Sequence, residues 1–217
     1  MSRVRAMLFD LDGTLLDSAP DLVRSLNFVR QSEGLEPLPL EQCARHASSG
    51  ALGLLRAGMP ATDPVQFEAW RERFLTHYAA HSCIDSRLYD GMPELLAELA
   101  SRAIPWGIVT NKVESLTWPI IEALQFEHGP GSVVCGDTLP RKKPDPAPVL
   151  LACSQLDRAP VETVFVGDDV RDIQAGVAAG TRTAAVLYGY GSCELRGPVV
   201  ANSEMIHAPG DLLRLIR

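Results

Sequence analysis

The stretch Phe9-Asp10-Leu11-Asp12-Gly13-Thr14-Leu15-Leu16-Asp17-Ser18 follows the apolar run Val4–Phe9, which is typical of a buried β-strand. Its first two carboxylates, Asp10 and Asp12, stand two residues apart at the point where the strand ends. Buried carboxylates at this spacing repel each other and lose their hydration. A bound cation is the usual compensation, and oxygen ligands favour a hard ion such as Mg²⁺. The stretch therefore predicts a metal site at the end of the first strand.

Short apolar runs alternate with helical patterns along the rest of the chain, as in a parallel sheet covered by helices on both faces. Further strands are predicted at Trp106–Val109, Ser132–Cys135, Thr163–Val166 and Thr183–Leu187. Helices are predicted at Pro93–Ser101, Val113–Leu124, Pro146–Leu156 and Ile173–Ala179, the second of them interrupted by Pro119. We therefore expect an α/β fold with a Rossmann-like parallel sheet.

One interval breaks this alternation, because about ninety residues separate the first strand from the second, whereas a crossover connection needs only about a dozen. The interval begins with Ser18-Ala19-Pro20-Asp21, which resembles a capping box with proline in the first helical turn. Leu52–Arg56 and Phe67–Ala80 also have helical patterns. We expect an all-helical cap domain at residues 17–86, inserted into a discontinuous core of residues 1–16 and 87–217.

Polar side chains gather at later strand ends as well. The fourth strand ends in Gly167-Asp168-Asp169-Val170-Arg171-Asp172, and the second ends in Thr110-Asn111-Lys112. The loop Arg141-Lys142-Lys143-Pro144 adds Lys143, which can act as a point charge on a phosphate. The carboxyl ends of parallel strands share one sheet edge, where open α/β sheets bind their ligands. The combination predicts phosphoryl transfer, in which a metal and a cation suppress the repulsion between a carboxylate and an anionic phosphate.

The charge of the chain argues against nucleic acid as a partner. Its 217 residues carry 20 Lys and Arg against 27 Asp and Glu, a formal net charge of −7, and the basic residues are scattered. No apolar stretch approaches the roughly 20 residues that a membrane helix needs. The five cysteines are odd in number and include no Cys-x-x-Cys pair, which indicates reduced thiols. We expect a cytoplasmic monomer or dimer that binds neither nucleic acid nor membranes.

Two other patterns carry little chemistry. His77 and His81 stand four residues apart on a predicted helix, but without a third ligand they indicate a packed or solvated pair. Gly189-Tyr190-Gly191 lacks the third glycine of a dinucleotide-binding loop, so a plain loop is expected there. The sequence has neither a phosphate-binding Gly-x-x-x-x-Gly-Lys-Ser/Thr loop nor a Gly-x-Ser-x-Gly elbow. ATP-dependent transfer and serine hydrolysis therefore have no support.

Four segments, in this order, resemble the four motifs of the haloacid dehalogenase superfamily of phosphatases: Asp10-Leu11-Asp12-Gly13-Thr14, Thr110, Lys143-Pro144 and Gly167-Asp168-Asp169. The resemblance implies that Asp10 is the nucleophile that becomes a phosphoaspartate and that Asp12 is the general acid and base. It also implies that Mg²⁺ is held by Asp10, the backbone carbonyl of Asp12, and Asp168. Thr110 and Lys143 would bind the phosphoryl group, and Lys143 would also restrain Asp10. The inserted helices match that superfamily's helical cap.

Two further carboxylates follow Asp168 along the chain. Asp169 is expected to assist the ion or to bind its water. Asp172 is expected either to support the ligands of the ion or to cap the following helix, and the two roles are compatible.

Within the superfamily, Asp90-Gly91-Met92-Pro93-Glu94, Ser48-Ser49-Gly50 and Thr110-Asn111-Lys112 resemble the phosphoglycolate phosphatase-like group. Residues 179–186 and Tyr188-Gly189-Tyr190-Gly191 narrow the resemblance to the bacterial branch that hydrolyses N-acetylmuramic acid 6-phosphate in cell-wall recycling. The resemblance implies a small phosphate ester as substrate. The expected substrate-binding residues are Arg45, Ser48, Ser49 and Gly50 in a loop between inserted helices, together with Asn111 and Lys112.

Other functions stay open at this point. A phosphomutase of the same superfamily would return the phosphoryl group to its substrate rather than to water. A phospho-acceptor signalling module also combines an acidic pair with Thr and Lys on a parallel sheet, but it is much shorter and lacks the helical insertion. A dehalogenase would need no acid and base at Asp12, and an inactive scaffold would not keep the chemical residues.

Overall fold

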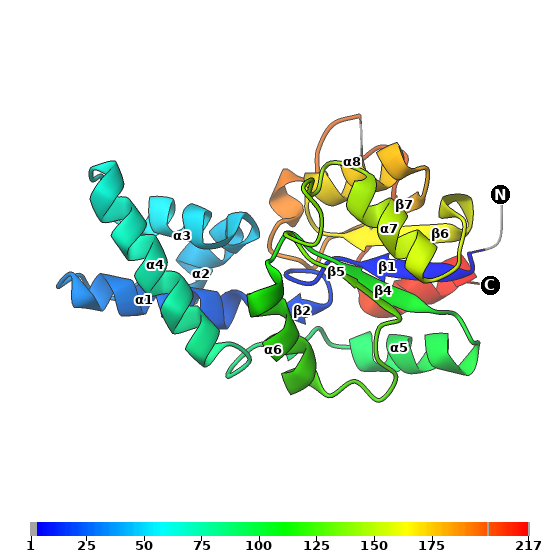
Figure 1. Cartoon of the computed structure of the whole chain (residues 1–217), viewed down its shortest axis with the longest axis horizontal. Coiled ribbons are helices and arrows are strands. Elements are labelled where there is room, and N and C mark those ends of the chain that lie inside the picture. Colours follow the sequence, from blue (N-terminus) through cyan, green and yellow to red (C-terminus); the bar gives the residue numbers. More distant parts are fainter. Residues whose placement is uncertain (1–3, 199, 217) are drawn as a thin grey trace.

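A computed structural model describes residues 4–198 and 200–216, and its centre is a parallel sheet. The strands of this sheet are β1 (Ala6–Phe9), β4 (Trp106–Val109), β5 (Ser132–Val134), β6 (Thr163–Gly167), β7 (Arg182–Val186) and β8 (Glu204–Ile206). Within the described residues they form six strands in the order β5-β4-β1-β6-β7-β8 (Figure 1). β1 therefore lies between β4 and β6. The Rossmann-like parallel sheet expected from the sequence is confirmed.

Helices cover both faces of the sheet. They are α5 (Met92–Ser101), α6 (Glu114–Leu124), α7 (Ala147–Gln155) and α8 (Val170–Ala179), with the 3₁₀ helices η2 (Pro160–Glu162), η3 (Ser192–Glu194) and η4 (Pro209–Ile216). Met7 and Phe9 of β1 pack on the face covered by α5 and η4, whereas Ala6 and Leu8 pack on the face covered by α7 and α8 (Figure 1). β1 is therefore apolar and buried along its whole length.

Three elements differ from the predicted ones. The predicted helix Ile173–Ala179 begins earlier, at Val170, because Asp169 caps it. Pro119 does not interrupt α6, which continues through it; a proline removes one helical hydrogen bond, and this helix tolerates the loss. β8 was not predicted, because only Ile206 of its three residues is buried and the segment has no apolar run.

The long interval between β1 and β4 contains the expected inserted helices. They are α1 (Ala19–Ser32), α2 (Leu40–Cys43), α3 (Gly50–Gly58) and α4 (Pro64–His81), with the 3₁₀ helix η1 (Ala44–Ser49) between α2 and α3. α1 packs against α3 and α4, and these helices lie to one side of the sheet (Figure 1). The division into residues 17–86 and residues 1–16 with 87–217 stays a prediction, and residues 1–3 and 217 lie outside the described part.

A short antiparallel ribbon marks the place where the chain leaves and re-enters the core. In it, β2 (Leu16–Asp17) pairs with β3 (Arg87–Leu88). Ser18 follows at the start of α1, but its side chain makes no capping hydrogen bond, so the predicted capping box is wrong. Ser18 has a helical backbone rather than the extended one of a capping residue, and its Oγ donates to Asp12 Oδ1 at 2.5 Å.

Asp21 ties α1 to the segment that returns to the core. Its buried carboxylate accepts hydrogen bonds from the backbone N–H groups of Ile84, Asp85 and Ser86 and from Ser86 Oγ. Arg24 Nη1 lies 2.8 Å from Asp21 Oδ1. Burial alone raises the pKa of Asp21, but the Ser86 hydrogen bonds and Arg24 outweigh it, so the pKa lies below its ordinary value. The ionised carboxylate therefore clamps one end of the inserted helices.

The five cysteines are free thiols, as their number and spacing predict. Among the described residues, no helix combines the length and the apolar character needed to cross a bilayer. The oligomeric state and the cytoplasmic location stay predictions.

Asp21→Asn is expected to lower the free energy of unfolding by about 1–3 kcal/mol, because the amide loses the charge that the buried donors require. Urea denaturation would show a lower midpoint with an unchanged slope. Since the native pKa of Asp21 is lowered, its contribution is complete above the unfolded pKa of about 3.9 and disappears as pH falls through the native pKa. The difference between the two proteins should therefore shrink in acid.

Glu72→Gln, at an exposed position of α4, is the matched control and should leave the midpoint unchanged. A midpoint for Asp21→Asn equal to that of the unmodified protein at neutral pH would contradict the clamp.

Candidate active site

The carboxyl ends of β1, β4 and β6 bring the predicted chemical residues to one edge of the sheet. Asp10 follows β1, Thr110 follows β4 and Asp168 follows β6. Because β1 lies between the other two strands, these three positions adjoin. They line the floor of a cavity of about 390 Å³, and the inserted helices line its other side. This volume is ordinary for a small-molecule site.

Three carboxylates gather on this floor. One oxygen each of Asp10, Asp168 and Asp172 lies within 4.8 Å of the others. Asp168 accepts hydrogen bonds from Thr14 Oγ1 at 3.2 Å and from the Gly191 N–H at 2.8 Å. Burial, together with the charges of Asp10 and Asp172, raises the pKa of Asp168 well above its ordinary value. The carboxylate cluster, defined as these three aspartates, is therefore short of positive charge.

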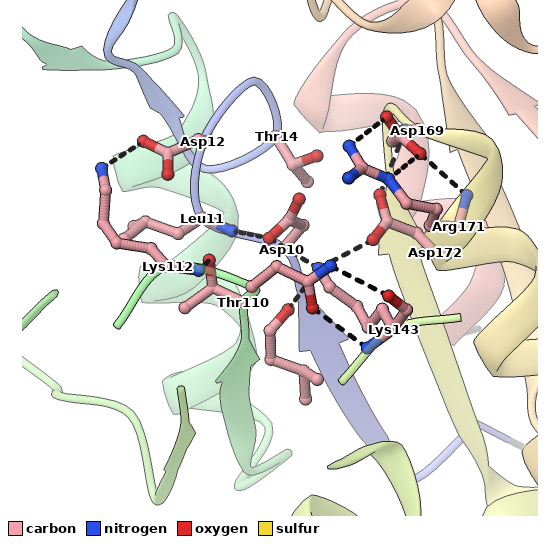
Figure 2. A network of polar contacts seen from close by, with 12 residues as sticks. Asp10, Leu11, Asp12, Thr14, Thr110, Lys112, Lys143, Asp169, Arg171 and Asp172 are labelled. Carbon is pink, nitrogen blue, oxygen red and sulfur yellow. Dashed lines mark hydrogen bonds and ion pairs between the residues drawn. The ribbon is translucent and has the colours of Figure 1, made fainter. Parts of the chain in front are cut away.

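The ammonium of Lys143 lies between Asp10 and Asp172 of the carboxylate cluster (Figure 2). Its Nζ is 2.8 Å from Asp10 Oδ1 and 2.8 Å from Asp172 Oδ1, and it donates to the Val109 carbonyl at 2.7 Å. Burial alone lowers the pKa of Lys143, but the two carboxylates outweigh it and raise the pKa. Burial raises the pKa of Asp10 above its ordinary value and raises the pKa of Asp172 to about 7. Lys143 lowers both pKa values, but burial outweighs this effect. Lys143 therefore stays charged.

The charge balance of the cluster fits a divalent cation. Three carboxylates face one ammonium, which leaves two formal negative charges among these groups when all three are ionised. The cluster offers carboxylate oxygens as metal ligands, and oxygen is the ligand type that Mg²⁺ prefers. The side chain of Asp12 is not part of the cluster, and the expected use of its backbone carbonyl stays a prediction.

Asp172 caps α8, which is one of the two roles expected for it, whereas its support of the metal ligands stays a prediction. Asp169 and Asp172 begin α8 as a capping box, in which Asp172 Oδ2 accepts the Asp169 N–H at 3.1 Å. The other oxygen of Asp172 pairs with Lys143. The start of α8 is thereby joined to the carboxylate cluster.

Asp169 differs from its expected role beside the ion. Its carboxylate pairs with Arg171 at 2.7 Å and accepts a hydrogen bond from Ser48 Oγ of η1 at 2.6 Å. Burial alone raises the pKa of Asp169, but these hydrogen bonds lower it to about 2. Arg171 also donates to the Ser48 carbonyl. Asp169 therefore connects the core to the inserted helices, because Arg171 and Ser48 supply a cation and a hydroxyl donor, whereas the carboxylates of the cluster would repel it.

Asn111 positions the loop that carries Lys143. Its Nδ2 donates to the Lys143 carbonyl and its Oδ1 accepts the Lys143 N–H, both at 3.0 Å. Asn111 lines the cavity, but both polar atoms of its amide already form hydrogen bonds with the backbone of Lys143. This argues against the expected substrate-binding role of Asn111. The preceding Thr110 accepts the Lys112 N–H through its Oγ1.

Asp12 lies away from Lys143 and pairs with Lys112 (Figure 2). Lys112 Nζ lies 2.7 Å from Asp12 Oδ1 and donates to Tyr78 Oη of α4 at 2.8 Å. Ser18 Oγ donates to the same oxygen of Asp12. Burial raises the pKa of Tyr78 to about 12, so the phenol keeps its proton. Lys112, expected to bind substrate, is instead paired with Asp12.

The turn Gly189-Tyr190-Gly191 belongs to the site, although its sequence indicates only a loop. Gly191 donates to Asp168, and Tyr190 Oη lies 3.0 Å from Ser18 Oγ. A Cβ on Gly189 would lie 2.2 Å from the Gly13 carbonyl oxygen, so only glycine allows this approach. The sequence signals for the turn are its place after a strand end and the resemblance of Tyr188-Gly189-Tyr190-Gly191 to one branch of the superfamily. Tyr78 has no signal beyond helical periodicity.

Ser48, Ser49 and Gly50 line the cavity, and their expected role in substrate binding stays a prediction. Residues 44–49 form the helix η1 rather than the expected loop. Arg45 lines a separate hollow of the inserted helices, and its Nε donates to His46 Nε2 at 3.2 Å. Arg45 lies a full turn of this 3₁₀ helix before Ser48. It is therefore separated from Ser48, Ser49 and Gly50 along η1 and does not line the cavity.

His77 and His81 form the packed pair that their spacing predicts. The His77 ring stacks on Phe28 and on His81, with centroid distances of 4.3 Å and 4.2 Å. Its Nδ1 lies 3.0 Å from Ser25 Oγ. These contacts account for the pair without a metal.

Comparisons with known sequences agree with this geometry. The profile of the haloacid dehalogenase-like hydrolases matches residues 7–186. The N-acetylmuramic acid 6-phosphate phosphatase of Pseudomonas aeruginosa is 44% identical over 189 residues, which cover 87% of this chain and 84% of that protein. The phosphoglycolate phosphatase of Xanthomonas campestris is 40% identical over 186 residues, which cover 86% of this chain and 84% of that protein.

Solved structures share the whole fold. The crystal structure of a predicted phosphoglycolate phosphatase from Haemophilus somnus has a TM-score of 0.84 and 26% identity, covering 100% of both chains. A haloacid dehalogenase-like family hydrolase from Streptococcus pneumoniae has a TM-score of 0.81 with 21% identity, also covering 100% of both. The second structure, at its low identity, shows the fold alone.

Mg²⁺ is expected to raise the melting temperature of the protein, because an ion bound by the native cluster stabilises the folded chain by mass action. At a concentration about a hundredfold above Kd the gain is about 2.7 kcal/mol. Asp168→Asn, which removes one carboxylate of the cluster, should abolish most of this shift. Thermal unfolding with Mg²⁺ and with EDTA measures the effect.

Asp63→Asn is the matched control, since asparagine keeps the N-cap of α4 while removing a carboxylate far from the cluster. It should keep the full Mg²⁺ shift. Equal shifts in Asp168→Asn and in the unmodified protein would show that the ion binds elsewhere.

Proposed function

This chain belongs to the haloacid dehalogenase-like hydrolase family, and we propose that it is a Mg²⁺-dependent phosphatase that hydrolyses a small phosphomonoester through a phosphoaspartate. The observation that carries the proposal is the placement of Asp10. It follows the central strand, lines the cavity floor, and has Lys143 Nζ 2.8 Å from one carboxylate oxygen. Relatives named as phosphatases over most of the chain support the same class of reaction, phosphoric monoester hydrolysis.

Asp10 is the nucleophile in this proposal. One of its oxygens attacks phosphorus, the bond from phosphorus to the ester oxygen breaks, and a phosphoaspartate forms. Lys143 reduces the repulsion between the two anions and holds Asp10 in place. Thr110 Oγ1 accepts the Lys112 N–H, which leaves its hydroxyl proton to donate to a phosphoryl oxygen.

Asp12 is the general acid and base. It protonates the leaving alkoxide and then takes a proton from the water that attacks phosphorus, which releases Asp10 and inorganic phosphate. Lys112 and Ser18 both contact Asp12 Oδ1, so this carboxylate has a defined position on the cavity wall.

The carboxylate cluster supports Mg²⁺ as the metal. Asp10, Asp168 and the backbone carbonyl of Asp12 would hold the ion, and Asp172 lies close enough to assist. When bound, the ion supplies positive charge to the phosphoryl oxygens. Lys143 keeps Asp10 and Asp172 together on the protein side of the site.

The candidate substrates are N-acetylmuramic acid 6-phosphate and 2-phosphoglycolate, the compounds in the names of the relatives. Both are small monoesters that also carry a carboxylate. The acidic chain, with its net charge of −7, accommodates such anions because part of its acidity binds the metal.

Asp10→Asn is expected to lower kcat for phosphate release by about a thousandfold or more, because the amide cannot form the phosphoenzyme. Phosphate release from both candidate substrates, with Mg²⁺, measures the loss. Asp63→Asn serves again as the control and should keep normal turnover. Near-normal activity of Asp10→Asn would show that Asp10 is not the nucleophile. If the unmodified protein released phosphate from neither candidate substrate nor from para-nitrophenyl phosphate, the proposed function would be wrong.

Asp12→Asn is expected to slow hydrolysis of alkyl phosphates by about a hundredfold to ten-thousandfold, because the leaving alkoxide is no longer protonated. With para-nitrophenyl phosphate, whose leaving group needs no proton, the first step should survive. Rapid mixing would then show a stoichiometric burst of para-nitrophenolate followed by slow turnover. A variant that slows both substrates equally and gives no burst would assign the acid and base to another group.

A further inference from the structure

One face of α4 forms the far wall of the cavity. Arg71, Phe74, Leu75 and Tyr78 all line it, and their spacing places them on a single side of the helix. Phe74 and Leu75 are apolar, whereas the two ends of the face carry a guanidinium and a phenol. The wall therefore presents polar groups at its ends and an apolar strip between them.

The Tyr78 end of this face is next to the proposed chemistry. Tyr78 Oη contacts Lys112 Nζ, which in turn contacts Asp12. Arg71 lies seven residues earlier on α4, and a rise of 1.5 Å per residue places it about 10 Å farther along the helix axis. Helical side chains also lean toward the N-terminus, which is the Arg71 end. Arg71 therefore marks the end of the cavity opposite the leaving-group oxygen.

Among the described residues, three of the four core cations that line the cavity already have anionic partners in the core, and the fourth, Lys142, is exposed in the loop before Lys143. Lys143 pairs with Asp10 and Asp172, while Lys112 pairs with Asp12. Arg171 pairs with Asp169. None of these three is available to a second anionic group of a substrate without breaking an ion pair of the core.

Arg71 differs from these cations. Within the described residues, it is the one charged side chain that the inserted helices contribute to the cavity. Its partner is Glu68, three residues earlier on the exposed surface of α4, with the two side chains 39% and 63% exposed. Such exposed pairs contribute little free energy, and Glu68 contacts one nitrogen of a fork with five N–H donors. A carboxylate can therefore replace or join Glu68 on Arg71.

We propose that Arg71 binds a carboxylate of the substrate, and that the substrate is a phosphorylated sugar acid whose carboxylate lies across the sugar ring from its phosphoryl group. This inference rests on the proposed function. A two-carbon acid such as 2-phosphoglycolate spans only about 4 Å between phosphorus and its carboxylate carbon, since the bonds are about 1.5 Å long. Its carboxylate would stay beside the phosphoryl site, whereas Arg71 lies about two turns of α4 beyond Tyr78. N-Acetylmuramic acid 6-phosphate carries its lactyl carboxylate across the sugar ring, and Phe74 and Leu75 offer an apolar surface to that ring.

The test uses two substrates that differ only in the lactyl group. kcat/KM is measured with N-acetylmuramic acid 6-phosphate and with N-acetylglucosamine 6-phosphate, which lacks the carboxylate. Arg71→Gln is expected to lower kcat/KM for the first by about tenfold to hundredfold, mainly through KM, as for a lost charged hydrogen bond. The preference for the first substrate over the second should fall by the same factor. Arg71→Lys should recover part of it, because an ammonium lacks the bidentate fork.

Arg73→Gln is the matched control. Arg73 lies on the same helix but pairs with Glu33 at 2.6 Å and does not line the cavity, so its loss should leave the preference unchanged. 2-Phosphoglycolate should be a poor substrate whose kcat/KM responds little to Arg71→Gln.

Three results would overturn the inference. They are an equal fall of kcat/KM on both sugar phosphates, no change on either, or a fall on 2-phosphoglycolate as large as that on N-acetylmuramic acid 6-phosphate. Each of these is obtained with an active phosphatase, so the proposed function survives them. Failure of the unmodified protein to release phosphate even from para-nitrophenyl phosphate overturns the proposed function and this inference with it.

Discussion

The ammonium of Lys143, held between Asp10 and Asp172, is the interaction on which the rest of the site depends. Burying two carboxylates at the end of a central strand is costly, and an ammonium between them removes most of the repulsion. The arrangement requires the β1 end, the start of α8 and the Lys143 loop to meet. β1 therefore lies between β4 and β6, Asp172 belongs to the capping box of α8, and Asn111 ties the Lys143 loop to the end of β4.

A second set of contacts joins this core to the inserted helices. Lys112 connects Asp12 to Tyr78, and Asp169 connects to Ser48. The carboxylate clamp of Asp21 fixes the base of the insertion, so the helices stand over the sheet edge in a defined position. The cavity is thus assembled from both parts of the chain, with reacting groups on the core and an apolar wall on α4. In the proposed function, this division separates the chemistry of phosphoryl transfer on the core from the selection of the leaving group by the inserted helices.

Much of the fold follows from local patterns. The apolar runs of β1, β4 and β6 end in Asp10, Thr110 and Asp168, and a strand end in a parallel sheet is where ligands bind, so these positions were accessible to sequence reasoning. The features of the site that the sequence did not predict are those without a distinctive local pattern. Tyr78 has the periodicity of any buried helical aromatic, and the Gly189–Gly191 turn has a pattern shared by many loops.

By itself, the sequence determined the α/β class, the helical insertion and the ordered set of Asp10, Asp12, Thr110, Lys143 and Asp168, because hydrophobic periodicity and strand ends are local properties of the chain. Only the tertiary structure decided the partner of each charged group. Asp169 pairs with Arg171 and Ser48 rather than joining the cluster, Lys112 pairs with Asp12, and Arg45 lies apart from the cavity. Which charges meet depends on how distant segments pack, since electrostatic energy is set by separation in space and by burial, and neither is encoded in a short stretch of residues.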